Sequence, residues 1–383
     1  DYYALDGLLS DEQKLVRATV REFVSDKILP VIDEHQREGT FPVEALPVMA
    51  DMGLLGANLE GYGLPGLDNI SYGLILQELE RGDSGLRSFV SVQGALCMYP
   101  IWRYGSEAQK QQWLPAMGSG DVIACFGLTE PDAGSDPGAM RTCAELDGGE
   151  WVLNGVKYWI TNGTIAQLAI VWAKTDKGIR GFLVPTDAPG FSANKVTGKY
   201  SLRVSDTAEL VLQDCRISAD NVLPNAEGLK GPLTCLNQAR YGIAWGAVGA
   251  AMACYDEALR YAKNRIAFGR PIAATQLMQE LLVECVTEIT KAQLMCLRLG
   301  QLKEAGTVTP QQVSMAKRNN VVMALNTART CREILGGNGI LDDYQSFRHM
   351  VNLESVYTYE GTHQIHTLIV GHDITGYPAF GER

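Results

Sequence analysis

The stretch Tyr357-Thr-Tyr-Glu-Gly-Thr-His-Gln-Ile-His366 joins two helical patterns near the end of the chain. Apolar residues recur with helical spacing on both sides of it, over 351–356 and over 365–369. Glu360 is thus held between the ends of two elements, directly before a glycine, where a carboxylate can still face a pocket. Taken by itself, Glu360 is a surface charge or a helix start, because most glutamates lie at the surface. The rest of the chain has to decide between these interpretations.

Long helical patterns lie upstream of this stretch. Apolar residues from 278 to 299 step by four and three, which is typical of a helix in a bundle. Thr309-Pro310 begins another helix, with the threonine as N-cap and the proline at the first position. Gly336-Gly337-Asn-Gly339 ends it. Residues 233–383 are therefore predicted to form a helical domain.

Residues 122–232 have a different, β-like pattern. Short apolar runs at 122–128, 150–153, 156–160, 168–173, 181–184 and 209–212 predict strands. Asp147-Gly148-Gly149 and Asn154-Gly155 are hairpin signals between them. The segment predicts an antiparallel β domain that closes with the loop 223–231.

The first 121 residues are predicted to be helical again. Ser10-Asp-Glu-Gln13 is a capping box before an amphipathic run, and Pro30 ends or bends that helix. Further helical runs are expected at 71–81 and 93–104. The sequence therefore predicts an α+β protein with a helical domain at 1–121, a β domain at 122–232 and a helical bundle at 233–383.

Composition limits the function classes. With 383 residues, 46% of them apolar and 20% charged, the chain is long enough for two or three domains. A net charge of −11 without a basic block argues against a nucleic-acid partner. The charge-free run 241–255 is too short for a membrane span and predicts a buried helix. Nine cysteines, an odd number without Cys-x-x-Cys, indicate reduced thiols, with no disulfide framework and no zinc site.

Two motifs suggest other functions but lack the context that those functions need. Gly61-x-Gly63-x-x-Gly66 fits a dinucleotide fingerprint, yet no β-α-β alternation surrounds it. Glu360-x-x-His363 occurs once, whereas a di-iron bundle needs two such copies, and His363-x-x-His366 has no accompanying zinc signature. We predict neither a Rossmann site nor a metal site.

Five separated segments resemble the acyl-CoA dehydrogenase family, and together they extend over nearly the whole chain. They are Phe126-Gly-Leu-Thr-Glu-Pro-Asp-Ala-Gly-Ser-Asp136, Trp159-Ile-Thr-Asn162, Asn264-Arg-Ile-Ala-Phe-Gly269, Leu335-Gly-Gly-Asn-Gly339 and Tyr359-Glu-Gly-Thr362. The resemblance implies the same order of helical domain, β domain and four-helix bundle. It also implies FAD as the cofactor, with Glu360 as the base that takes the α-proton of an acyl thioester.

The resemblance further implies a set of cofactor contacts. The flavin ring is expected against Phe126, Leu128, Thr129, Trp159 and Thr161, and other FAD contacts are expected at Ser135, Arg265, Phe268, Gly336, Gly337, Thr362 and Gln364. Arg265 and Phe268 are implied to reach the FAD of a neighbouring subunit, which predicts a homo-oligomer, in this family usually a homotetramer. The simpler alternatives are a hairpin-core tryptophan, a helix-end arginine and C-capping glycines.

Within the family, the segment Glu78-Leu-Glu-Arg-Gly-Asp-Ser-Gly-Leu-Arg-Ser88 is most similar to glutaryl-CoA dehydrogenases. The likeness implies that Arg87 and Ser88 bind the distal carboxylate of glutaryl-CoA, with Glu80 and Tyr359 beside it. Ser135 and Arg240 fall at positions that contact CoA. The expected reaction is oxidative decarboxylation to crotonyl-CoA and CO2, as in lysine and tryptophan degradation.

Some residues depart from that subgroup and leave an alternative open. Gln364 stands where close glutaryl-CoA enzymes often have Asp, and Phe89 and Gly94-Ala95 are unusual beside Arg87. The alternative is a short-chain monocarboxylic acyl-CoA dehydrogenase or an acyl-CoA oxidase.

The expected electron acceptor is an electron-transfer flavoprotein. No targeting segment is visible in the sequence. The expected compartment is the cytoplasm if the protein is bacterial and the mitochondrial matrix if it is eukaryotic.

Overall fold

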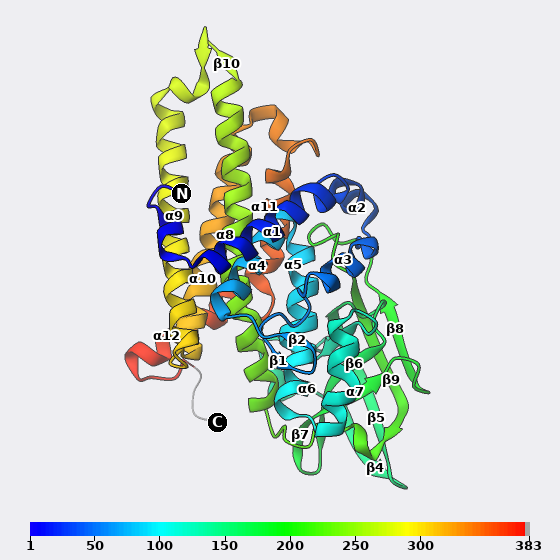
Figure 1. The fold of residues 1–383 in the computed structure, drawn as a ribbon. Helices are drawn as coiled ribbons and strands as arrows, with labels where there is room; N and C mark the ends of the chain where they lie inside the picture. Colours follow the sequence, from blue (N-terminus) through cyan, green and yellow to red (C-terminus); the bar gives the residue numbers. More distant parts are fainter. Residues whose placement is uncertain (380–383) are drawn as a thin grey trace.

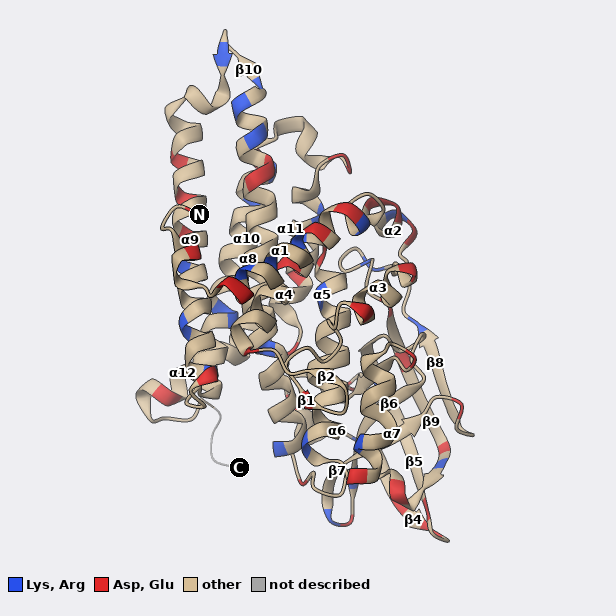
Figure 2. Cartoon of the chain, in the orientation of Figure 1, with Lys and Arg blue, Asp and Glu red and all other residues tan. Residues whose placement is uncertain are grey.

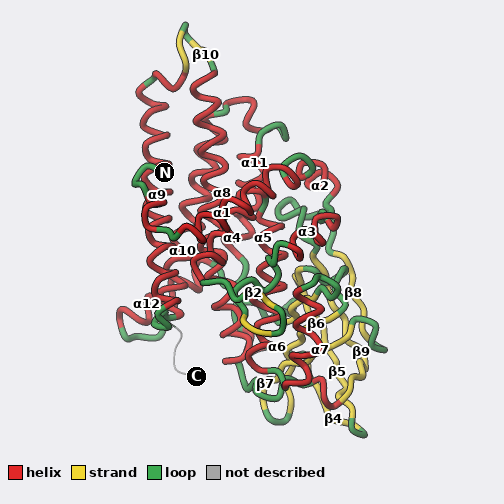
Figure 3. The backbone as a smooth tube through the Cα atoms, in the orientation of Figure 1, coloured by secondary structure: helices red, strands yellow, loops and turns green. Residues whose placement is uncertain are grey.

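The computed structural model describes residues 1–379, so residues 380–383 of the predicted C-terminal domain lie outside it. Long helices form one end of an elongated molecule, the β sheet lies at the opposite end, and shorter N-terminal helices lie between them (Figure 1). The strands between residues 124 and 218 gather in one region, whereas a short strand pair lies at the far tip of the long helices (Figure 3). The predicted order and the α+β class are confirmed.

The N-terminal part is helical, as expected. Its helices are α1 (Asp11–Phe23), α2 (Ile32–Glu38), α3 (Leu46–Asp51), α4 (Asn69–Gly82), α5 (Ser84–Ser91), α6 (Tyr99–Tyr104) and α7 (Glu107–Gly118). Two π-helical turns, Val24–Ile28 and Val92–Met98, extend α1 and join α5 to α6. The capping box at Ser10 forms, and the first helix ends before Pro30.

The glycine fingerprint is a turn. Gly61, Gly63 and Gly66 lie in and beside a small hairpin of β1 (Glu60–Gly61) and β2 (Leu64–Pro65). All three have positive φ angles, of 81°, 79° and 64°. A conformation that favours glycine explains why three glycines occur there. The expectation that this motif is not a dinucleotide site is consistent with the hairpin.

The middle of the chain forms a seven-stranded sheet. Its strands are β3 (Ala124–Gly127), β4 (Cys143–Asp147), β5 (Glu150–Thr161), β6 (Leu168–Thr175), β7 (Gly178–Pro185), β8 (Phe191–Lys195) and β9 (Thr207–Ser218). Their order is β3-β6-β4-β5-β9-β8, with β7 paired to β6. The sheet is mixed and not antiparallel throughout, because β6 pairs in parallel with β3 and β4. Hairpin signals report only on consecutive strands, so these crossovers could not be predicted from them.

One predicted turn is instead a bulge. The hairpin at Asp147-Gly148-Gly149 forms between β4 and β5, but Asn154-Gly155 lies inside β5. The β5–β9 register shifts between Leu153 and Gly155. A Cβ added at Gly155 would lie 2.3 Å from the Thr142 hydroxyl, which requires glycine there. The dipeptide therefore serves close packing at a bulge.

The C-terminal part contains the longest helices. They are α8 (Lys230–Asn264), α9 (Gln276–Glu304), α10 (Pro310–Ile334), α11 (Gln345–Thr358) and α12 (His363–Thr375). A small hairpin of β10 (Ile266–Ala267) and β11 (Arg270–Pro271) joins α8 to α9 and projects from the far end of the bundle (Figure 1). A 3₁₀ turn, Gly336–Ile340, follows α10. The charge-free run 241–255 lies in α8 and is mostly buried, as predicted.

Several expected absences can be examined within residues 1–379. No helix there has the length and apolar character to cross a bilayer. No group of three or more His, Cys, Asp and Glu side chains is arranged to hold a metal ion in that part of the chain. All nine cysteines are free, and all but Cys143 are buried.

Candidate active site

Glu360 lies in a strained turn between α11 and α12. Its φ is 51° and that of Gly361 is 95°, so two consecutive residues are left-handed. A Cβ at position 361 would lie within 3.1 Å of the His366 ring and the Arg240 guanidinium, which makes glycine necessary. Thr362 N-caps α12 by accepting a hydrogen bond from Ile365 N–H at 3.2 Å. A non-glycine residue held at positive φ costs about 1–3 kcal/mol and often marks a functional site.

Buried cations hold the carbonyls of this turn. Lys317 on α10 donates from Nζ to Tyr359 O and, at 2.7 Å, to Gly361 O. Arg240 on α8 donates from Nε to Glu360 O at 2.7 Å. The Lys317 and Arg240 side chains are both buried. The backbone around Glu360 is therefore anchored to two helices of the bundle.

The Glu360 carboxyl group lies in a desolvated, positively charged setting. Its Oε2 is buried and forms no hydrogen bond within the described chain. Burial raises the pKa of Glu360 above its ordinary value, against the opposing charges of Arg87, Lys317 and Arg240. A carboxylate with a free oxygen and a raised pKa is suited to accept a proton.

Beside this turn, α4 and α5 supply a buried ion pair. Arg87 donates from Nε to Glu80 Oε2 at 2.7 Å, and both side chains are fully buried. Ser84 donates its hydroxyl to Glu80 Oε1 at 2.8 Å. Gly246 on α8 leaves room for the pair, because a Cβ there would lie 2.0 Å from Glu80 Oε2.

The ion pair connects to the Glu360 turn through Tyr359. Arg87 Nη2 donates to the Tyr359 hydroxyl, which lies 3.2 Å from Ser88 Oγ. The remaining nitrogen, Arg87 Nη1, is buried without a partner among residues 1–379. We call Glu80, Arg87, Ser88 and Tyr359 the Arg87 cluster. The structure thus brings together the four residues that the sequence assigned to a distal carboxylate.

The predicted flavin-facing residues lie on the sheet. Lys157 on β5 donates from Nζ to Leu128 O at 3.1 Å and to Glu130 Oε1 at 2.8 Å, so it fixes the segment after β3. Tyr158 N–H donates to Thr129 O at 2.9 Å. Trp159 has a φ of 63° and is 59% exposed, so it is not the core of a hairpin. Phe126 is buried, Thr161 is half-buried on β5, and Ser135 is exposed on the β3–β4 connection.

A third group lies far from Glu360 in this chain. Arg265 and Phe268 occupy the β10–β11 hairpin, where Phe268 is fully exposed with a φ of 51°. Basic residues mark this tip in Figure 2. Gly336 and Gly337 lie at the same end of the bundle, where Asn338 donates to the Tyr261 hydroxyl of α8 at 3.1 Å. From Lys317 to Gly336 along α10 the rise is about 28 Å, so the chain does not bring this group to its own Glu360.

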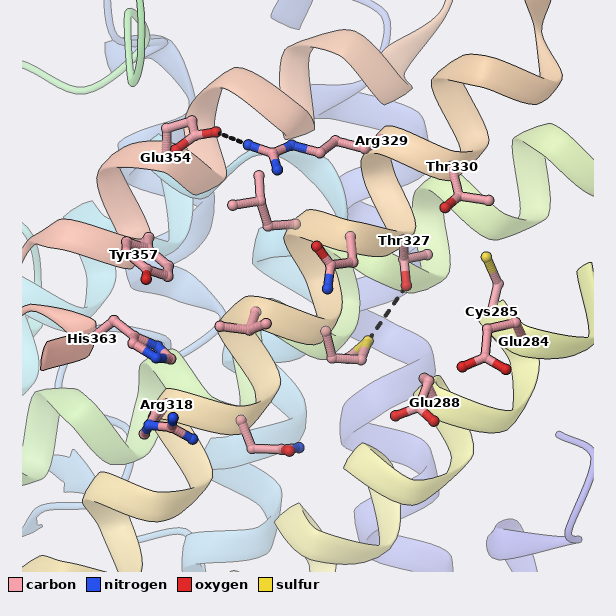
Figure 4. Close-up of a pocket in the computed structure, with 15 residues that line it drawn as sticks. Glu284, Cys285, Glu288, Arg318, Thr327, Arg329, Thr330, Glu354, Tyr357 and His363 are labelled. Atoms are coloured by element: carbon pink, nitrogen blue, oxygen red, sulfur yellow. Dashed lines mark hydrogen bonds and ion pairs between the residues drawn. The ribbon is translucent and has the colours of Figure 1, made fainter. Parts of the chain in front are cut away.

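A separate cavity of about 900 Å³ lies along α9, α10 and the α11–α12 junction (Figure 4). It is lined by residues that include Arg318, Glu354 and His363. His363 stacks on Tyr357 with ring centroids 4.8 Å apart. Gln364, which follows His363 at the start of α12, is exposed. This cavity does not include the Arg87 cluster.

Comparison with known proteins identifies the family. The models of the acyl-CoA dehydrogenase N-terminal, middle and C-terminal domains match residues 10–121, 125–215 and 226–375. The chain belongs to the acyl-CoA dehydrogenase family. The dehydrogenase is similar to a Mycobacterium smegmatis glutaryl-CoA dehydrogenase solved in complex with FADH2, with a TM-score of 0.98, 50% identity, and coverage of 99% of this chain and 98% of that one.

Other relatives of the dehydrogenase act on different substrates by name. The human mitochondrial short-chain specific acyl-CoA dehydrogenase is 36% identical over 377 residues, which cover 96% of this chain and 92% of the relative. The butyryl-CoA dehydrogenase of Megasphaera elsdenii has a TM-score of 0.92 at 32% identity, with coverage of 96% of this chain and 98% of that one. These relatives all belong to the same family, but their names give different acyl groups for the substrate.

The dehydrogenase is an FAD-dependent oxidoreductase, as its family is. Its own residues fit that cofactor. Trp159 is an exposed aromatic residue, and its neighbour Tyr158 donates its N–H to Thr129 O, so an aromatic ring suited to stack on a flat ring lies next in the chain to a residue bonded to the 128–130 segment. The hydrogen bond from Lys157 to Leu128 O holds the segment that contains Leu128 and Thr129 in place.

The sequence analysis missed two residues that shape the site of the dehydrogenase. Lys317 interrupts the buried face of α10 between Val313 and Val321, at a spacing of four residues. A charged residue in an apolar stripe is the signal that was available. Gly246 gave no signal, because nothing in the sequence shows which side chain a helical glycine faces.

Proposed function

We propose that this enzyme oxidises a short dicarboxylic acyl-CoA, specifically glutaryl-CoA, and releases crotonyl-CoA and CO2. The observation that carries the proposal is the unpartnered Nη1 of the fully buried Arg87. A buried guanidinium nitrogen without a partner is costly, and an anionic group on the substrate would satisfy it. The 50% identity with a glutaryl-CoA dehydrogenase supports the same substrate.

In the oxidation, Glu360 takes the α-proton of the thioester. Its burial raises its pKa, which brings its basicity closer to that needed at neutral pH. Bound FAD supplies the acceptor for the hydride that leaves the β-carbon. The Glu360 N–H, which makes no hydrogen bond within the described residues, is available to the thioester oxygen as enolate charge develops.

Decarboxylation would follow at the Arg87 cluster. The oxidised acyl chain carries its carboxylate on the γ-carbon, next to the double bond that is conjugated with the thioester, so the C–C bond electrons can pass into the enoyl thioester as CO2 leaves and form a dienolate. Glu80 already neutralises Arg87, so the substrate carboxylate adds a net negative charge beside the pair, and loss of neutral CO2 relieves it. Protonated Glu360 is placed to return a proton to the dienolate, which gives crotonyl-CoA.

A second candidate is a short-chain monocarboxylic acyl-CoA dehydrogenase or an oxidase. Two observations favour it. The curated relatives at 36% identity carry the short-chain name, and Arg87 already has Glu80 as a counter-charge, so the site is electrostatically balanced without a substrate anion.

The remaining roles are also proposed. Arg240 and Ser135 are proposed to contact CoA. The distance between Glu360 and the Arg265, Phe268, Gly336 and Gly337 group supports an FAD site completed by a second copy of the chain, with Thr362 and Gln364 on the Glu360 side. An electron-transfer flavoprotein is the proposed acceptor. The proposed compartment is the cytoplasm of a bacterium or the mitochondrial matrix.

One experiment decides between the two candidates. The FAD-loaded enzyme is mixed anaerobically with glutaryl-CoA or butyryl-CoA, flavin bleaching is followed, and the products are analysed. Glutaryl-CoA is expected to bleach the flavin at the higher kcat/KM and to yield crotonyl-CoA with one CO2 per turnover. Preference for butyryl-CoA, without CO2 from glutaryl-CoA, would establish the second candidate.

A further inference from the structure

Three consecutive carbonyl groups at Glu360 point at buried cations. The carbonyls of Tyr359 and Gly361 accept hydrogen bonds from Lys317, and the carbonyl of Glu360 itself accepts one from Arg240. The two flanking carbonyls thus share a single donor atom, Lys317 Nζ. A single side chain of α10 therefore holds both ends of the left-handed turn.

The contact with Tyr359 O also sets the direction of the next N–H. In a trans peptide the C=O and the following N–H point in opposite directions. Because Tyr359 O faces Lys317, the Glu360 N–H points away from α10. We propose that Lys317 is a positioning residue, which aims the N–H and the carboxylate of Glu360 at the bound thioester by holding both flanking carbonyls. This inference rests on the proposed role of Glu360 as the base.

The proposed role does not depend on the charge of Lys317. Burial lowers the pKa of Lys317 well below its ordinary value, although the negative charge of Glu360 acts in the opposite direction. A neutral amine still has two N–H donors, and two carbonyls accept from it. The ammonium form has a third donor and faces the Tyr359 ring at 5.7 Å. Both forms therefore hold the turn.

Arg240 cannot replace Lys317 in this role. Its Nε contacts the Glu360 carbonyl, which fixes the following peptide and the N–H of Gly361. The peptide that carries the Glu360 N–H is fixed by Lys317 through Tyr359 O. Removal of Lys317 therefore affects the donor and the base directly, while the contact of Arg240 with the Glu360 carbonyl remains in place.

The test compares Lys317→Met with the wild-type FAD-loaded enzyme. Methionine keeps most of the volume but has no donor. Because misplacement of a reacting group by about 1 Å costs about 100-fold in rate, we expect kcat to fall about 10- to 100-fold while KM changes less than about threefold. Lys317→Arg, which retains donors, is expected to recover part of the loss.

The pH profile provides a readout that simple destabilisation does not change. The ionisable groups around Glu360 come from every neighbouring element: Arg87 on α5, Arg240 on α8, Lys317 on α10, His366 on α12, Tyr72 on α4, and Tyr359 in the same turn. The charge of Lys317 opposes the rise in the Glu360 pKa. Loss of an ammonium group at Lys317 should lower kcat and move its acidic limb to higher pH, whereas loss of a neutral amine should lower kcat and leave that limb unchanged.

Lys303→Met is the matched control. Lys303 is a half-buried lysine of the bundle, placed on α9 over the Tyr241 ring at 5.2 Å, and it does not contact the Glu360 turn. Its loss should lower Tm and leave kcat and the acidic limb unchanged. If Lys317→Met binds FAD and keeps both wild-type kcat and pH profile, the inference is wrong.

A third variant separates the two proposals. If Glu360→Gln stays active, the proposed base is wrong, and the proposed role of Lys317 falls with it. If Glu360→Gln is inactive while folded Lys317→Met behaves as the wild type, only the role of Lys317 is overturned. If Lys317→Met fails to fold, Lys317→Arg is used in its place. A wild-type kcat and pH profile in Lys317→Arg would support the donor role. A loss of activity in Lys317→Arg as large as that in Glu360→Gln would contradict it.

Discussion

Arg87 and Glu80 form an ion pair with 2.7 Å between Nε and Oε2, and neither side chain is exposed to solvent. Desolvation of such a pair is costly, and the cost is recovered only where the remaining donors are satisfied. Arg87 Nη2 reaches the Tyr359 hydroxyl, but Nη1 reaches nothing in the described chain. The pair is therefore better suited to bind an anion than to stabilise the fold.

Arg87→Met should change selectivity more than stability once its partner is also neutralised. The single variant leaves Glu80 buried and unpaired, which costs about 3–5 kcal/mol. The Glu80→Gln/Arg87→Met double variant removes both charges and should recover most of that stability. In it, kcat/KM for glutaryl-CoA should fall at least about 100-fold and that for butyryl-CoA less than about tenfold. An equal loss of kcat/KM for both substrates would show that Arg87 does not bind the distal carboxylate.

Gly246→Ala should disturb the same pair from α8. The added methyl group would lie 2.0 Å from Glu80 Oε2 and 3.2 Å from Arg87 Nε. We expect Tm to fall and turnover of glutaryl-CoA to drop, measured by thermal unfolding and steady-state assay. Gly371→Ala on α12 is the control, because nothing lies within 4 Å of its added Cβ. There the change should be neutral or stabilise by up to about 1 kcal/mol.

The sequence predicted much of this site but not its geometry. Glu360 stood out through its place between two helical patterns, and Arg87 through the resemblance of its segment. The contact between Arg87 and Tyr359 joins residues 272 positions apart, which no local pattern encodes. Lys317 was missed as a site residue because a lysine in a helix is usually exposed. Here its side chain is buried, and it donates hydrogen bonds to two carbonyls of another segment.

The fold shows the same limit. Periodicity and caps predicted the helices and the order of the three parts, since these signals are local. The parallel pairing of β6 with β3 and β4 depends on strands that are not neighbours in sequence. Asn154-Gly155 predicted a turn from its residue types, yet contact with Thr142 makes it a bulge.

The activity should be lost at low pH as Glu360 becomes protonated. The base works only when ionised, and burial raises its pKa above the ordinary value of 4.5. The acidic limb of kcat/KM should therefore lie above pH 4.5 and disappear in Glu360→Gln, whose residual rate should be at least about 100-fold lower. A pH-independent rate through this range would contradict the assignment of Glu360 as the base.

Lys157→Met should weaken retention of FAD. Lys157 is fully buried and joins Glu130 to the Leu128 carbonyl. Burial alone raises the pKa of Glu130, but hydrogen bonds from Arg141 N–H and Lys157 outweigh it and lower the pKa to about 2. The variant leaves Glu130 buried without its cation, so we expect about 3–5 kcal/mol of destabilisation and a lower ratio of bound flavin to protein. A normal flavin content would show that this segment does not support the cofactor.

Mixed oligomers can test whether one site uses two chains. Arg265 lies at the bundle end that is about 28 Å along α10 from the Glu360 turn. If Arg265 serves the FAD of a neighbour, Arg265→Ala and Glu360→Gln will each be inactive alone. A hybrid pair then has one site with both defects and one with neither. Random mixing of equal amounts should restore about a quarter of the wild-type activity, because half of the pairs are hybrids with one intact site of two.

If each chain builds its own site, every site in the hybrid carries one defect, and mixing restores nothing. The appropriate control is a mixture of Glu360→Gln with Glu80→Gln/Arg87→Met, assayed with glutaryl-CoA. All three residues lie on the Glu360 side of one chain, so those hybrids should stay inactive under either model. Recovery in the first mixture and not in the second would establish that the hairpin tip completes the site of another copy.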